Sequence, residues 1–73
     1  MMEEYSRILI ENYCFTHKSS KSNRLWKLVT LSYDPASEVS DSDAVFLEKA
    51  IAQEKDPELK EALQDLDDYL FGW

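Results

Sequence analysis

The only thiol and the only imidazole of this chain, Cys14 and His17, lie three residues apart. A cysteine with a histidine is the minimum set for a nucleophilic thiol, and on a helix this spacing would place both side chains on one face. No glycine-rich turn or oxyanion site accompanies the pair, and the apolar neighbours Tyr13 and Phe15 are typical of a packed cysteine. We therefore predict that Cys14 is structural and that the protein is not an enzyme.

The chain lacks the residues that usually bind metal ions and phosphate groups. A tetrahedral zinc site would need further cysteines or histidines, and the chain has none. The acids Asp41 and Asp43, and those within residues 65–68, resemble fragments of calcium loops without the mid-loop glycine or the closing glutamate. The single glycine, Gly72, cannot form a glycine-rich phosphate loop. We expect no metal, no cofactor and no catalytic residue.

The charged residues are unevenly distributed along the chain. Residues 1–34 hold four acids and five bases, whereas residues 35–73 hold eleven acids and three bases, within a net charge of −7. The C-terminal half would repel phosphate groups and anionic membranes, which argues against nucleic-acid or membrane binding through it.

A basic stretch lies beside Trp26 in the N-terminal half, and its members are His17, Lys18, Lys21, Arg24 and Lys27. We interpret it first as a solvated surface. The second interpretation is a docking surface for the acidic half, within the molecule or between two copies. A nucleic-acid contact comes last, because bases and aromatics together suit one but the chain as a whole is acidic.

Length and composition indicate one small domain spanning residues 1–73. A core of this size rarely contributes more than about 3–5 kcal/mol without a disulfide, a metal or a partner. The lone cysteine cannot form an internal disulfide and suits a reducing compartment. No stretch approaches the roughly 18 apolar residues that span a bilayer, and residues 1–4 are acidic where a secretory signal would be basic. We expect a cytoplasmic protein whose partner, or second copy, adds stability.

The C-terminal half predicts two helices. An apolar face with spacings of four, three and four residues predicts a helix over about 57–71. Asp56 and Pro57 are typical of its start, and Gly72 of a left-handed end. The residues of this face are Leu59, Leu63, Leu66 and Leu70.

A second apolar stripe predicts a helix over about 43–54, with Ser40 and Asp43 approximating a capping box. The short break before Pro57 predicts that the two helices form an antiparallel pair. The residues of this stripe are Phe46, Leu47, Ala50 and Ile51.

The N-terminal half is ambiguous. Residues 4–16 are rich in side chains that suit a sheet, and residues 24–33 fit either a helix capped by Ser22 or Asn23, or a strand. With residues 18–23 as a loop, residues 4–33 could form a β-hairpin. That loop contains no glycine, which favours helices. We therefore predict an all-α bundle of three to four short helices. The alternative is an α+β fold with an N-terminal hairpin packed on the two C-terminal helices.

The candidate partner-binding site is the C-terminal end, where aromatics lie among acids. Tyrosine and tryptophan bury large areas at low entropic cost, which is typical of interface hot spots. The alternative is that the last aromatics fold over the helix end as a hydrophobic cap. The site residues are Asp65, Asp67, Asp68, Tyr69, Phe71 and Trp73.

The leading hypothesis for function is a non-enzymatic protein-binding module, such as an inhibitor, an antitoxin-like protein or an adaptor. It would cover a basic surface of a partner protein, and in a sharper form its carboxylates would mimic the phosphates of DNA. The alternative is a self-assembling homo-oligomer that pairs its leucine face or joins its basic half to its acidic half.

Overall fold

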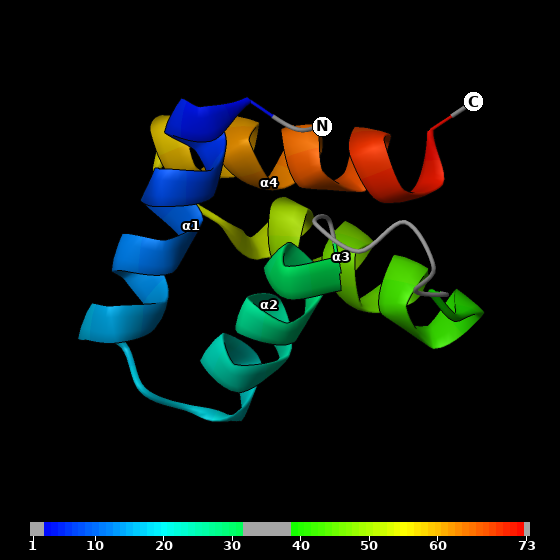
Figure 1. The fold of residues 1–73 in the computed structure, drawn as a ribbon, viewed down its shortest axis with the longest axis horizontal. Helices are drawn as coiled ribbons and strands as arrows, with labels where there is room; N and C mark the ends of the chain where they lie inside the picture. The colour runs from blue at the N-terminus through cyan, green and yellow to red at the C-terminus, as the bar shows by residue number, and fades with distance from the viewer. Residues whose placement is uncertain (1–2, 32–38, 73) are drawn as a thin grey trace.

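Four helices make up the fold of residues 3–31 and 39–72, which are the residues that the computed structural model describes. They are α1 (Glu4–Thr16), α2 (Ser20–Leu31), α3 (Asp41–Gln53) and α4 (Pro57–Phe71). These two ranges contain no strand, so the all-α prediction is confirmed and the hairpin alternative is wrong. In Figure 1, α2 returns alongside α1, and α3 and α4 run in opposite directions.

The core is formed by one apolar face from each helix. Helix α1 packs against both α4 and α2, and α3 packs against α4, so α1 and α4 hold the bundle together. The predicted face of α4 is buried through Leu59, Leu63 and Leu66, while Leu70 is partly buried. The largest apolar side chains that are fully buried are Ile10, Leu25, Leu28, Leu47, Leu63 and Leu66.

The predicted helix caps of the C-terminal half are confirmed. Ser40 is the N-cap of α3, and its reciprocal hydrogen bonds with Asp43 form a capping box. Because Ser40 itself is the cap, α3 begins at Asp41, two residues before the predicted start. The carboxylate of Asp56 accepts a hydrogen bond from the backbone N–H of Glu58 at 3.0 Å, and proline opens α4 as predicted.

Helix α2 begins four residues earlier than predicted. The hydroxyl of Ser19 accepts a hydrogen bond from the backbone N–H of Ser22 at 3.2 Å, so Ser19 caps the helix and the predicted caps lie inside it. Ser22 is buried there, and its hydroxyl donates to the carbonyl oxygen of His17. The predicted loop over residues 18–23 therefore shrinks to the few residues between α1 and α2.

Gly72 ends α4 without adopting the left-handed conformation, so that prediction is wrong. Its φ is −74° and its ψ is 146°. Its N–H donates to the carbonyl oxygen of Asp68 at 2.8 Å, and a Cβ atom at position 72 would meet that same oxygen. Glycine therefore serves a close backbone approach here. Tyr33, Trp73 and most of the predicted loop over residues 34–42 lie outside the described residues.

No helix among the described residues is both long and apolar enough to cross a membrane.

Candidate functional site

The side chains of Cys14 and His17 make separate contacts in the structure. The thiol of Cys14 donates to the carbonyl oxygen of Ser22 at 3.3 Å, whereas the imidazole of His17 stacks on the ring of Tyr13 at 4.5 Å. Burial, followed by the charge of Glu11, raises the pKa of the Cys14 thiol. An activated cysteine needs a lowered pKa, so this thiol has the environment of a packing residue.

The basic stretch is partly docked within the molecule. The guanidinium of Arg24 lies 3.3 Å from a carboxylate oxygen of Asp43 on α3 and 4.5 Å from the ring centre of Phe46. The ammonium of Lys21 lies 5.7 Å from the ring centre of Tyr13. The ion pair between Arg24 on α2 and Asp43 at the start of α3 is therefore a specific contact that fits docking within the molecule.

The structure distributes the predicted site residues over different sides of α4. The hydroxyl of Ser6 on α1 donates to the carboxylate of Asp65 at 2.7 Å. Burial raises the pKa of Asp67, and the charges of Asp68 and of Glu48 on α3 raise it further. Asp65 therefore faces α1, whereas Asp67 lies near α3.

The remaining predicted residues differ in their exposure. Asp68 and Tyr69 are exposed next to each other, and the side chain of Tyr69 retains 43% of its accessible surface. Phe71 packs against the core, which fits the hydrophobic-cap alternative, and Trp73 lies outside the described residues. Among the predicted residues that the structure describes, Asp65, Asp68 and Tyr69 thus lie close together on α4.

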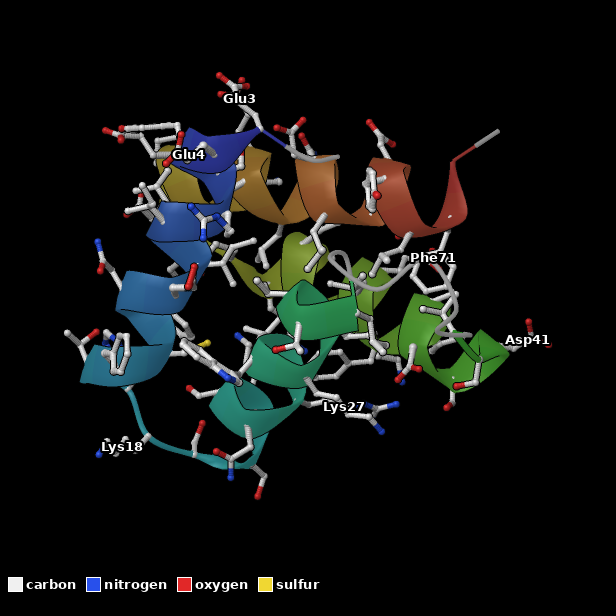
Figure 2. All side chains as sticks on the ribbon, viewed as in Figure 1. Glu3, Glu4, Lys18, Lys27, Asp41 and Phe71 are labelled. Carbon is white, nitrogen blue, oxygen red and sulfur yellow. The ribbon has the colours of Figure 1, made fainter. Side chains whose placement is uncertain are left out.

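A continuous stripe of carboxylates extends this smaller set along α4. Its members recur at intervals of three, four and three residues, which places them on one side of a helix. In Figure 2, red-tipped side chains project from α4 on the side away from α3. The same period revealed the leucine face in the sequence, so the stripe was detectable there. We call it the acidic stripe, and it consists of Glu58, Glu61, Asp65 and Asp68.

The beginning of α1 borders the acidic stripe. The phenol of Tyr5 donates to the carboxylate of Glu58 at 2.8 Å, and this hydrogen bond, together with the negative charge, raises the pKa of Tyr5. A hollow of about 170 Å³ lies between the two helices, and Glu3 lines it with three carboxylates of the stripe. Figure 2 shows Glu3 and Glu4 beside the start of α4. No group of three or more described side chains is placed to hold a metal ion.

Comparisons with known proteins add no relative: no protein-family model, no curated protein and no solved structure matches the chain. The fold and the charge pattern alone therefore define the class, which is a small acidic helical protein with four helices in its described residues.

Proposed function

We propose that this protein is a non-enzymatic binding module that uses the acidic stripe of α4 to cover a basic surface of a partner protein. The observation that carries this proposal is the alignment of four carboxylates on one side of a single helix, where three are exposed and Asp65 is half-buried against α1. Between Glu58 and Asp68 the stripe extends about 15 Å at the rise of an α-helix. Such a row of like charges destabilises an isolated helix slightly, and the hydrogen bonds from α1 reach only Glu58 and Asp65, so they do not account for Glu61 and Asp68.

The surroundings of the stripe fit a protein interface. Tyr5 and Tyr69 are exposed beside its two ends, with 58% and 43% of their accessible surface retained. Carboxylates would accelerate encounter with a basic partner, and the tyrosines would bury apolar area once the complex forms. Two stripe carboxylates accept hydrogen bonds from α1, which fixes their orientation in advance of binding.

The test neutralises the stripe without disturbing its hydrogen bonds. Neither Glu61 nor Asp68 has a side-chain hydrogen bond to another described residue, so the double variant E61Q/D68N removes two charges and keeps both contacts to α1. The matched control, D41N/E48Q, removes two charges from exposed residues of α3. Each tagged protein is used to capture partners from its native lysate, with elution at rising salt, and affinity for the captured partner is then measured.

The stripe variant should bind the partner about tenfold more weakly and with a shallower salt dependence than the wild type. The control should bind like the wild type. Equal loss in both variants, or no loss in the stripe variant, would contradict the proposal.

Duplex DNA added to the complex tests the DNA-mimic form of the proposal. Displacement of the partner's bound module by DNA would support phosphate mimicry, because both ligands would then occupy one basic surface. Simultaneous binding of the module and DNA would exclude mimicry and leave the general proposal intact.

A further inference from the structure

A second surface, which is aromatic and contains no acid, lies where α1 ends and α2 begins. The side chains of Phe15 and Trp26 retain 64% and 40% of their accessible surface, and their rings meet edge to face with centres 5.2 Å apart. They border a hollow of about 250 Å³, which we call the aromatic hollow. Its lining residues are Cys14, Phe15, Lys18, Ser22, Asn23 and Trp26.

The aromatic hollow is lined by one base, Lys18, and by no acid, in an otherwise acidic protein. The chain has no acid between Glu11 and Asp34, whereas four bases fall in that interval. Arg24 is engaged with α3 and lines a separate hollow together with Lys27, whereas Lys18 belongs to the aromatic hollow (Figure 2). Aromatic walls beside a lysine suit an aromatic side chain that is flanked by carboxylates.

The end of α4 offers that combination within the same chain. Asp68 and Tyr69 are adjacent and exposed, and Asp65 lies one turn before Tyr69. We propose that the aromatic hollow of one copy receives the Asp68–Tyr69 end of α4 from a second copy. Tyr69 would pack against the exposed rings, and the carboxylate of Asp68 would pair with Lys18.

The two surfaces lie at opposite ends of the molecule, so the contact joins copies head to tail. In Figure 1 the end of α4 is at the right, whereas the connection between α1 and α2 is at the lower left. Such a heterologous contact leaves a free hollow at one extremity and a free helix end at the other, and assembly therefore continues into chains or closed rings.

The net charge of −7 opposes association only at long range. At physiological ionic strength the screening length is about 8 Å, so the charges at the contact dominate over those elsewhere on the two copies. Those at the contact have opposite signs. The contact is small, and we expect it to be weak and dependent on protein concentration.

The test uses two variants that each remove one side of the contact. K18Q/W26A removes the receiving surface, and D68N/Y69A removes the inserted end. The matched control E4Q/Y5A removes one acid and one exposed tyrosine from the start of α1. Sedimentation velocity at physiological salt, from micromolar to millimolar concentration, measures the mass of each protein alone and in mixtures.

The wild type and the control should show a mass that rises with concentration, whereas each contact variant alone should remain a monomer. An equal mixture of the two contact variants should form a one-to-one dimer that grows no further, because it contains one intact hollow and one intact helix end. If W26A unfolds the protein by circular dichroism, K18E provides the receiving-side variant with the ring in place.

A wild type that is monomeric throughout, contact variants that associate like the wild type, or a mixture that stays monomeric would overturn the proposal. Binding of a single-stranded oligonucleotide to the hollow would also overturn the proposal, because it would assign another occupant. Such binding would quench tryptophan fluorescence in the wild type but not in W26A, and it would prevent self-association. The K18Q/W26A variant separates this proposal from the preceding one, since it should lose self-association while still capturing the basic partner.

Discussion

Asp43 and Asp67 are chemically identical side chains on neighbouring helices, and their surroundings shift their pKa values in opposite directions. Burial opposes the charge of Asp43, but hydrogen bonds from the backbone and hydroxyl of Ser40 and from Arg24 outweigh it and lower the pKa. Asp67 has no such donor among the causes of its shift, so burial and two nearby carboxylates raise its pKa. One carboxylate therefore stabilises the fold at neutral pH, whereas the other opposes it.

For Asp43 we expect D43N to lower the free energy of unfolding at pH 7 by about 1 kcal/mol, the usual loss for a broken helix cap. A lowered pKa means that the contribution of Asp43 is present above the ordinary pKa of an aspartate and is lost as the pH falls through the folded-state value. The difference in free energy of unfolding between the wild type and D43N should therefore disappear at low pH. Urea unfolding at a series of pH values measures it, with the exposed D41N as the control. A gap that persists unchanged at low pH would show that the charge is not responsible.

For Asp67 the charged carboxylate has the opposite effect on the free energy of unfolding. Its raised pKa means that the folded state binds the proton more tightly than the unfolded state, so the charged form destabilises the fold and acid relieves this. D67N should raise the free energy of unfolding at pH 7 by up to about 0.5 kcal/mol, the usual limit for a surface substitution. The difference should vanish as the pH falls through the raised pKa, since both side chains are then neutral. Destabilisation by D67N at pH 7 would contradict this assignment.

At the scale of elements, the start of α2 is set by one hydroxyl. S19A should lower the free energy of unfolding by about 1 kcal/mol, because it removes the side-chain acceptor for the N–H of Ser22. N23A should have little effect, since Asn23 is exposed inside the helix and does not cap it. Thermal unfolding of the two variants distinguishes the observed start from the one that the sequence predicts. The reverse order of stabilities would place the start of the helix at residue 24.

Helices α3 and α4 were predictable from the sequence because local signals agree there. A side-chain cap, a proline or a capping box, and an apolar period all indicate the same helix, and each acts over a few residues. Helix α2 lacks that agreement: several serines precede it, and only the packing of Ser22 against α1 selects Ser19 as the cap. The extended end of α4 at Gly72 likewise depends on a backbone approach that no residue pattern records.

The candidate site was predictable in charge but not in geometry. The excess of acids in the C-terminal half directs attention to α4, and helical spacing places Asp65, Asp68 and Tyr69 close together on it. Nothing in the chain order shows that Asp67 lies toward α3 or that Phe71 packs against the core, because both depend on where neighbouring helices lie. The exposed ring of Phe15 beside Trp26 is a tertiary contact between α1 and α2 and was not foreseen.

At the scale of the whole molecule, Asp68 belongs to both proposed binding surfaces. A basic partner on the acidic stripe and a second copy on the end of α4 would both cover that carboxylate. They should therefore exclude each other, so that raising the protein concentration lowers the apparent affinity for the partner. The K18Q/W26A variant, which keeps the stripe but cannot receive a second copy, should show no such dependence in a titration at two protein concentrations. An equal dependence in both proteins would mean that the two surfaces do not compete.

The acidic stripe also places binding and stability in opposition. Glu61 lies three residues after Glu58 and four before Asp65, so its charge repels both, and each such pair costs about 0.2–0.5 kcal/mol. E61K replaces these repulsions with attractions and should raise the free energy of unfolding by about 0.5 kcal/mol while weakening partner binding. Added salt should stabilise the wild type more than E61K, because it screens the repulsion that the variant has removed. The control E48K makes the same charge change on α3, outside the acidic stripe, and should leave partner affinity unchanged. If E61K stabilised the fold and bound the partner as tightly as the wild type, the stripe would serve solubility alone, because its charge would then be dispensable for recognition.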